Sequence, residues 1–356
     1  MGLGDIRRRI DLIDYEIVKL LNERMEHALR LKRLKCGIFD PDREEQVMEN
    51  IRRFSRNLIR PDFCEVLYRQ IMSESRRIQG QDAKVVGFQG EHGAYSEVAA
   101  LAYDPSFIPM PCGEFADVFQ GVEANQLDFG IVPVENSLEG SITPVTDLLI
   151  GTDLKIVGEI DIPIHHCLLA LPEMELEDIR VVHSHPQAIA QCRGFIRDQG
   201  FAAEPFYDTA GAARMLSEQR PPSGAAIASE LCATLYNLKI VTGNIEDHAS
   251  NTTRFVILSR EADAGEGNKC SLMFSAKHEV GTLFSVLKIF SDAEINLTRI
   301  ESRPMRNDPD QYAFLLDFKG SDRDEKVMDS MRQLEEQAVT FKFFGCYSSK
   351  ALPKVT

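Results

Sequence analysis

A change of pattern near Lys84 constrains this 356-residue chain more than any other feature. Residues 5–79 show no strand-like alternation of apolar and polar side chains, so they are predicted to be helical throughout. Pro41 and Pro61 divide this region, because the residue before a proline disfavours the helical backbone conformation. The three expected helices cover 5–36, 42–56 and 61–79. From Lys84 onward, short apolar runs alternate with helical stretches, which predicts an α/β fold with a largely parallel sheet.

A second boundary lies at the polar, glycine-containing segment 261–268 (EADAGEGN). The segments after it follow the order βαββαβ, which is typical of a small ferredoxin-like α+β module. A chain of this length is also too long for one ordinary hydrophobic core. The sequence therefore predicts three domains, one all-α, one α/β and one α+β. Their expected bounds are 1–82, 83–261 and 268–350.

The charge distribution and the cysteines exclude several classes of protein. The net charge of −15 is uneven: residues 1–82 carry +2 and the remainder −17, and an acidic body argues against nucleic-acid binding. There is no run of 18 apolar residues and no secretory signal pattern, so we expect no membrane partner. The eight cysteines are scattered, without metal-ligand spacing. They predict reduced thiols in the cytoplasm and neither a metal nor a cofactor.

The apolar stripe of the first predicted helix is interrupted by cations. Arg24 and Lys35 are 11 residues apart, so they fall within about 20° of each other and roughly 16 Å apart along the helix axis. Two long cationic side chains on one face can clamp a small dianion, although such side chains also extend to solvent from the edge of a helix. Arg7 is rotated by about 100° from Arg24 and would face elsewhere, toward a second copy of the chain.

Together with nearby polar residues, these cations resemble the all-helical chorismate mutase family over about 80 residues. The matching residues are Arg7, Asp14, Arg24, Lys35, Asp40, Arg43, Glu44, Ser75 and Gln79. The resemblance implies an interlocked dimer in which Arg7 of one chain and Arg24 of the other bind substrate carboxylates. Lys35 and Gln79 would donate to the ether oxygen, with Asp40 and Glu44 at the ring hydroxyl and Arg43 and Ser75 in support. Fixed cations and donors suit a pericyclic rearrangement, which needs no nucleophile.

In the α/β part, polar motifs follow predicted strands, where ligands sit in open α/β sheets. They are the glycine-rich turn 90–96, Glu135-Asn136-Ser137, Ser184-His185-Pro186-Gln187 with Gln191, and Asn251-Thr252-Thr253-Arg254-Phe255. Each has a purely structural alternative. Ser184 with Gln187 reads as a capping box, Thr253 suits any strand, and His165-His166 lies in an apolar run typical of core histidines.

The motifs ENSxxGS, SHPQxxxQC and TRF, in this order, resemble the prephenate dehydratase family over about 84–260. The resemblance implies two α/β lobes around a cleft, as in periplasmic binding proteins. It implies that Thr253 protonates the departing hydroxyl group. Substrate-binding roles follow for Glu135, Asn136, Ser137, Ser184, Gln191 and Arg254. Ala94 stands where bacterial members commonly carry Thr or Ser. The turn with Ala94 is more similar to that of arogenate dehydratases. The attached mutase, however, would make prephenate and so favours prephenate as the substrate.

Residues 270–347 resemble the ACT domain, a small-molecule sensor. Gly281-Thr282-Leu283 opens its first predicted helix, and Glu301-Ser302-Arg303-Pro304 ends its second predicted strand. The resemblance implies that both motifs bind phenylalanine, although the family usually has Ala where Thr282 stands. An ordinary helix cap and a turn would explain the same residues without a ligand.

The combined hypothesis is a bifunctional chorismate mutase/prephenate dehydratase of phenylalanine synthesis, restrained by L-phenylalanine. Its small-molecule partners would be chorismate, prephenate and L-phenylalanine, and the chain would form a homodimer or homotetramer. Two alternatives stay open. One is an arogenate dehydratase with a fused mutase, and the other is a non-catalytic ligand sensor in which the helical part only dimerises.

Overall fold

A computed structural model describes residues 2–34, 37, 39–55, 58–263, 265–277, 279–305 and 308–351. Contacts between residues divide the chain into two compact units, one up to Lys84 and one from Val85 onward. The multidomain architecture, with a helical part, a two-lobed α/β part and a C-terminal α+β module, confirms the predicted fold class.

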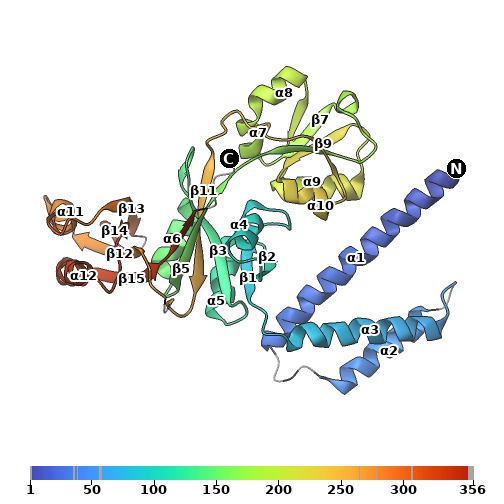
Figure 1. The fold of residues 1–356 in the computed structure, drawn as a ribbon, viewed down its shortest axis with the longest axis horizontal. Coiled ribbons are helices and arrows are strands. Elements are labelled where there is room, and N and C mark those ends of the chain that lie inside the picture. Colours follow the sequence, from blue (N-terminus) through green and yellow to red (C-terminus); the bar gives the residue numbers. More distant parts are fainter. Residues whose placement is uncertain are drawn as a thin grey trace. The chain divides into compact units, whose positions relative to one another are not determined.

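The helical unit consists of α1 (Leu3–Leu34), α2 (Pro41–Phe54) and α3 (Pro61–Gly80), in agreement with the three predicted helices (Figure 1). Asp40 caps α2, because its Oδ1 atom accepts a hydrogen bond of 3.0 Å from the Arg43 backbone N–H. Both α1 and α2 pack against α3. Among the described residues of the unit, the buried apolar ones are few: Ala28, Leu29, Met48 and Met72. One chain alone therefore gives these helices only a small core.

A row of exposed apolar residues runs along α1, and we call it the α1 seam. Its members are spaced alternately by three and four residues, and each is at least 42% exposed: Ile6, Ile10, Ile13, Ile17 and Leu20. This spacing is that of a coiled-coil interface. Continuous exposed apolar surface of this kind marks a site of association.

The first lobe of the second unit is built on a sheet with the strand order β16-β5-β11-β3-β1-β2. Strands β1 (Val85–Gln89), β2 (Ile108–Cys112) and β3 (Phe129–Asn136) are parallel. Strand β11 (Thr252–Ser259) runs antiparallel to both β3 and β5 (Lys155–Pro163). The helices of this lobe are α4 (Tyr95–Tyr103), α5 (Phe115–Glu123) and α6 (Thr143–Gly151). The short β4 (Gly140–Ser141) pairs with the end of β3.

The second lobe has its own five-stranded sheet, in the order β10-β6-β9-β7-β8. Its strands are β6 (Cys167–Ala170), β7 (Val181–Ser184), β8 (Ala202–Pro205), β9 (Gly224–Ala228) and β10 (Lys239–Thr242). Its helices are α7 (Pro186–Gln191), α8 (Arg193–Gln199), α9 (Thr209–Gln219) and α10 (Glu230–Leu235). The chain enters this lobe after β5 and returns to the first lobe at β11, so two crossings join the lobes (Figure 1).

The C-terminal module has the predicted βαββαβ order. It contains β12 (Lys269–Lys277), α11 (Thr282–Asp292), β13 (Leu297–Met305), β14 (Asp308–Lys319), α12 (Glu325–Gln337) and β15 (Thr340–Tyr347). Its core lies between the two helices and one face of the sheet and includes Phe274, Phe290 and Leu316. A last strand that the sequence did not reveal, β16 (Ser349–Ala351), returns to the first lobe and pairs with β5.

Candidate functional site

A hollow of about 420 Å³ lies between the two lobes, and we call it the cleft. The first lobe contributes strand ends and the start of α4, and the second lobe contributes the starts of α7 and α9. Its polar lining residues are Gln89, Tyr95, Ser96, Asn136, His166, His185, Gln187, Gln191, Tyr207, Asp208, Thr209, Asn251 and Thr253. Three residues predicted for the dehydratase site, Asn136, Gln191 and Thr253, therefore share this cleft.

A chain of hydrogen bonds between side-chain amides connects these residues. The direction of donation along it is determined at the Asn136 end. The Asn136 Oδ1 atom accepts hydrogen bonds from the backbone N–H groups of Leu138 (3.0 Å) and Glu139 (3.1 Å). Its Nδ2 group must then donate, and it donates to Asn251 Oδ1 (2.7 Å) and to Thr253 Oγ1 (2.9 Å). Thr253 is thus an acceptor in this network. Its own hydroxyl proton remains available to a molecule bound in the cleft.

The same direction of hydrogen-bond donation continues to the second lobe. Asn251 Nδ2 donates to Gln191 Oε1 (3.2 Å), and Gln191 Nε2 donates to Glu139 (3.2 Å). The His166 Nε2 atom lies 2.8 Å from Gln191 Oε1, so this ring nitrogen carries a proton. His166 Nδ1 lies 2.9 Å from the Tyr95 hydroxyl group. Burial lowers the pKa of His166, which favours the neutral imidazole.

The glycine-rich turn before α4 shapes one wall of the cleft. Gly90 and Gly93 have φ angles of 113° and 93°, in a region that favours glycine. A side chain at Gly93 would also clash with Cys232 Sγ. The Gly93 N–H donates to the buried Glu97 carboxylate (2.6 Å), so it is already occupied. The N–H groups of Tyr95 and Ser96, in the first turn of α4, have no acceptor within the helix and lie at the cleft.

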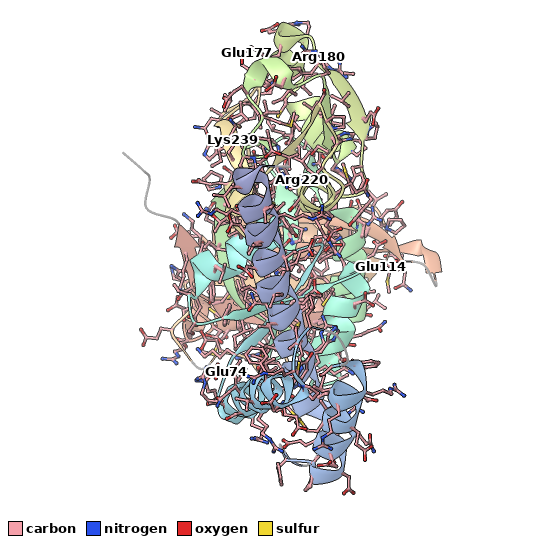
Figure 2. The ribbon with its side chains drawn as sticks, turned by 90° about the vertical axis from the view of Figure 1, so that its right-hand side faces the viewer. Glu74, Glu114, Glu177, Arg180, Arg220 and Lys239 are labelled. Carbon is pink, nitrogen blue, oxygen red and sulfur yellow. The ribbon has the colours of Figure 1, made fainter. Side chains whose placement is uncertain are left out.

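Lysine and arginine are absent from the described residues that line the cleft. The acidic side chain that lines it is Asp208, which caps α9 by accepting from the Gly211 N–H (2.8 Å). Burial raises the pKa of Asp208. Two cations of the second lobe pair outside the cleft lining: Lys239 with Glu175 (2.7 Å) and Arg220 with Glu173 (2.8 Å). Figure 2 labels the side chains of Lys239 and Arg220. Helix N-termini and amides therefore provide the anion-attracting groups of the cleft.

Four other residues predicted for this site have different surroundings. Ser184 is fully buried and donates to the Ile227 carbonyl (2.6 Å). Ser137 donates to the Ser250 carbonyl (3.2 Å). Glu135 lies 3.2 Å from Arg254, whose guanidinium group also contacts Asp317 (2.7 Å) of the C-terminal module. For Glu135 and Arg254, alternation along β3 and β11 explains the separation from Asn136 and Thr253, because neighbours in a strand point to opposite faces.

His166 and Asp208 line the cleft but are not among the predicted site residues, and Tyr95 and Asn251 line it although their predicted motifs gave them no role of their own. From the sequence, a core position is the more ordinary interpretation of His166, because it follows an apolar strand. The informative signal is its location at the point where the chain leaves the first lobe, which is where a two-lobed protein places its ligand. For Asp208 the sequence shows only a good helix cap.

A second hollow, also of about 420 Å³, lies in the C-terminal module and is called the effector hollow below. It is lined by Ala276, Glu279, Gly281, Thr282, Leu283, Phe284, Ser302, Tyr312 and Phe314. Gly281 is the N-cap of α11 with a φ of 91°. The predicted effector residues Gly281, Thr282, Leu283 and Ser302 therefore lie together. Pro304 is not among the lining residues, and the side chains of Glu301 and Arg303 contact the first lobe instead.

In the helical unit, the predicted mutase residues fall into small groups. Gln79 Nε2 donates to Ser75 Oγ (3.2 Å), Glu44 pairs with Arg76, and Arg43 Nη1 donates to Gln46 (3.3 Å). Arg24 Nη1 is buried and has no hydrogen-bond partner in the described part of the chain. Arg7 and Asp14 are exposed. Lys35 lies outside the described residues.

In the part of the chain that the structure describes, no group of three or more His, Cys, Asp or Glu side chains could hold a metal ion. Over the same residues, no helix is both long enough and apolar enough to cross a membrane.

Comparisons with known proteins match each part of the chain to a family. Residues 6–80 match the model of chorismate mutase type II, residues 86–263 that of prephenate dehydratase, and residues 271–336 that of the ACT domain. The bifunctional chorismate mutase/prephenate dehydratase of Aquifex aeolicus (strain VF5) is 33% identical, over 98% of this chain and 99% of the relative.

Two further relatives match the second unit. The chloroplastic arogenate dehydratase/prephenate dehydratase 2 of Arabidopsis thaliana is 42% identical, over 74% of this chain and 72% of its own length. The solved structure of prephenate dehydratase from Arthrobacter aurescens, in complex with L-Phe, is 30% identical with a TM-score of 0.69. That match covers 74% of this chain and 89% of the solved one. From the near-full-length match and the order of the three domains, the chain belongs to the family of bifunctional chorismate mutase/prephenate dehydratases and is an enzyme with two activities.

Proposed function

We propose that the chain catalyses two successive steps of phenylalanine synthesis, with the second step in the cleft. The helical unit rearranges chorismate to prephenate, and the cleft converts prephenate to phenylpyruvate. The observation that carries this proposal is the amide chain from Asn136 to Gln191, which leaves the Thr253 hydroxyl proton free in the cleft.

In the dehydratase step, the C–O bond at C4 of the ring breaks as the C1 carboxylate leaves as CO2. Thr253 donates its proton to the departing hydroxyl group, which leaves as water, and the two electrons of the broken C–C bond complete the aromatic ring. Solvent then restores the threonine proton, so the step consumes one proton overall. Threonine is a weak acid, so the hydrogen bond from Asn136 Nδ2 to its oxygen supports the step by stabilising developing negative charge.

The anionic groups of the substrate are bound without lysine or arginine from the described cleft residues. The N–H groups at the start of α4 suit a carboxylate, because the N-terminus of a helix carries partial positive charge. Gln191 and Asn136 orient the ring. Glu135, Ser137 and Arg254 support the two segments that carry Asn136 and Thr253. Ser184 holds the end of β7, directly before the helix α7 that carries Gln191.

The mutase step takes place in a site that a second copy of the chain completes. The α1 seam supports this assembly, because its exposed isoleucines match the spacing of an interhelical interface. Arg24 follows the seam residues Ile10 and Ile17 at the same spacing of seven, and its buried Nη1 group lacks a partner in the described chain. Arg7 of the second copy and Arg24 bind the carboxylates, and Lys35 and Gln79 donate to the ether oxygen. Asp40 and Glu44 bind the ring hydroxyl group, with Arg43 and Ser75 in support.

L-Phenylalanine is the proposed effector, and it binds in the effector hollow. Tyr312, Phe284 and Phe314 offer aromatic contacts for its ring, and the first turn of α11 suits its carboxylate. We also predict that the protein resides in the cytoplasm and that it assembles as a dimer or a tetramer.

Product analysis tests the proposal. The purified chain is supplied with chorismate alone, with and without L-phenylalanine, and the products are separated by chromatography. We expect phenylpyruvate to form and L-phenylalanine to slow its formation. Prephenate that accumulates without phenylpyruvate would contradict the second activity.

Arogenate is a second candidate substrate for the cleft, and Asp208 favours it. Arogenate carries an ammonium group where prephenate carries a keto group, and a carboxylate in a cleft whose described lining lacks lysine and arginine suits that cation. Asp208→Asn tests this, because Asn caps a helix as well as Asp does and removes only the charge. If arogenate is a substrate, D208N lowers its turnover more than that of prephenate. Equal effects on both would exclude the recognition of the amine by Asp208.

A further inference from the structure

The strand β13 presents its side chains alternately to the effector hollow and to the first lobe. Ser302 lines the effector hollow. Its two neighbours, Glu301 and Arg303, point to the other face of the sheet, as expected for consecutive residues in a strand. One strand therefore touches both the proposed effector and the domain that holds the cleft.

The contacts of Glu301 and Arg303 fall on one segment of the first lobe. The Glu301 carboxylate accepts from Ser141 Oγ (2.7 Å) and from Thr146 Oγ1 (3.4 Å), and its side chain is 12% exposed. Arg303 Nε donates to Asp147 Oδ1 at 3.0 Å. Ser141 lies in β4, which pairs with Glu135 and Asn136 at the end of β3, and Thr146 and Asp147 lie in α6 directly after it. These two side chains thus hold the segment that carries Asn136.

A second contact holds the strand that carries Thr253. Arg254, the next residue in β11, contacts Asp317 (2.7 Å) and Glu159 (2.9 Å). Asp317 is the register partner of Arg299, which stands two residues before Glu301 in β13 and contacts it. The same pair of strands, β13 and β14, therefore supports both segments that deliver the hydrogen-bonded pair Asn136 and Thr253 to the cleft.

This buried contact is incompletely satisfied. Arg299 Nε is buried without a hydrogen-bond partner among the described residues, and Arg254 Nη2 has an ion pair with Glu135 (3.2 Å) but no well-aligned hydrogen bond there. An unsatisfied polar group in a buried network is costly, so this contact is less than fully stabilised in the arrangement that the structure shows. Regulation requires that such a contact have a second arrangement, because an effector acts only by binding one arrangement better than the other.

We propose that Glu301 and Arg303 transmit occupancy of the effector hollow to the cleft and do not themselves bind the effector. The inference rests on the proposed binding of L-phenylalanine in the effector hollow. A ligand at Ser302 shifts β13, and Glu301 and Arg303 carry that shift to Ser141 and Asp147, and so to Asn136. The motif Glu301-Ser302-Arg303 is then divided by strand alternation into one ligand-contacting residue and two coupling residues.

The test separates binding from inhibition in the full-length protein. The variants are Glu301→Gln, Arg303→Met and Ser302→Ala, and Lys288→Gln serves as a control that breaks an exposed ion pair with Asp292 in the same module. Calorimetry measures the dissociation constant for L-phenylalanine. A prephenate assay measures inhibition, expressed relative to the uninhibited rate of each variant, and thermal melts check folding.

We expect E301Q and R303M to bind L-phenylalanine with dissociation constants within about tenfold of the wild-type value. Inhibition of prephenate conversion should weaken much more, by about 5–150-fold, which is the usual size of a coupling between two sites. We expect S302A to weaken binding and inhibition together, and K288Q to change neither. If E301Q and R303M lose binding as S302A does, or keep full inhibition, the coupling role is overturned. If the wild-type protein itself shows no binding or no inhibition, the proposed effector fails, and the coupling fails with it.

Discussion

At the scale of single residues, two backbone N–H groups decide the direction of every hydrogen bond along the amide chain of the cleft. The N–H groups of Leu138 and Glu139 fix the Asn136 amide, which fixes Asn251 and makes Thr253 an acceptor. Position 136 therefore needs both ends of an asparagine side chain. Its oxygen accepts from the backbone N–H groups of the turn, and its nitrogen donates to the Thr253 hydroxyl oxygen. Neither aspartate nor leucine supplies both.

Replacement of Thr253 tests the role of its proton. Thr253→Ala should lower the rate of prephenate conversion by about 10²-fold or more, since proton donation contributes at least that much. Thr253→Ser keeps the hydroxyl group and its hydrogen bond from Asn136, so most activity should remain. Steady-state rates on prephenate provide the measurement, and near-normal turnover by T253A would exclude the proposed proton donor.

His166 should make folding stability depend on pH. Burial lowers its pKa, while the hydrogen bond to Gln191 and the charge of Glu246 oppose this effect. Below the unfolded value of about 6.5, the unfolded chain binds a proton that the folded chain does not, so stability falls as the pH drops through this window.

Denaturation of the wild type and of His166→Gln between pH 5 and 8 measures this dependence. The stability of the wild type relative to H166Q should decrease below about pH 6.5. Replacement of the exposed His248 with Gln is the matched control for the removal of one imidazole. A constant difference between wild type and H166Q over the whole range would contradict the lowered pKa.

At the scale of elements, alternation and spacing decide which residues of a motif act together. The helix bounds, the α/β rhythm and the βαββαβ order could be predicted from periodicity and prolines, because local patterns determine them. Which side chains of β3, β11 and β13 face a ligand could not be predicted, because the sequence does not tell which face of a strand the ligand meets. Glu135, Arg254 and Glu301 stand beside Asn136, Thr253 and Ser302 in sequence and on the opposite face in space.

The α1 seam gives a prediction at this scale. Glutamates at Ile10 and Ile17 would place unpaired charges in the proposed interface, at a cost of several kcal/mol. We expect the double variant Ile10→Glu, Ile17→Glu to lose mutase activity while dehydratase activity on prephenate persists. Asn22→Glu adds the same charge on a different, exposed face of α1 and should have little effect.

Mutase assays and light scattering, referred to the 40.0 kDa chain, measure both consequences. The double variant should associate less than the wild type and N22E. Full mutase activity with unchanged association in the double variant would show that the seam has no role in the assembly.

At the scale of the whole molecule, the C-terminal module is joined to the first lobe by buried charges as well as by β16. Arg254, Lys269 and Arg299 meet the carboxylates of Glu159, Glu301 and Asp317. Burial alone would raise the pKa of Asp317, but Arg254 and Arg299 outweigh it and lower the pKa below its ordinary value. This part of the contact therefore remains ionised at neutral pH and weakens only in acid.

Loss of Arg254 should strongly destabilise the second unit. Arg254→Met leaves Asp317 and Glu159 with fewer cationic partners in a buried place, which typically costs about 3–5 kcal/mol. Arg323→Gln breaks the exposed pair with Glu266 and should cost at most about 1 kcal/mol. Denaturant titrations of the full-length variants compare the two. A loss of stability in R254M no larger than that in R323Q would contradict the buried network.

The central claim is that one chain processes the same ring in two separate sites, first in the helical unit and then in the cleft. Chorismate supplied to full-length Thr253→Ala tests it most directly, with chorismate, prephenate and phenylpyruvate followed by chromatography. The account predicts that chorismate disappears at the wild-type rate and that prephenate accumulates in its place. Phenylpyruvate at the wild-type rate, or chorismate that persists, would contradict it.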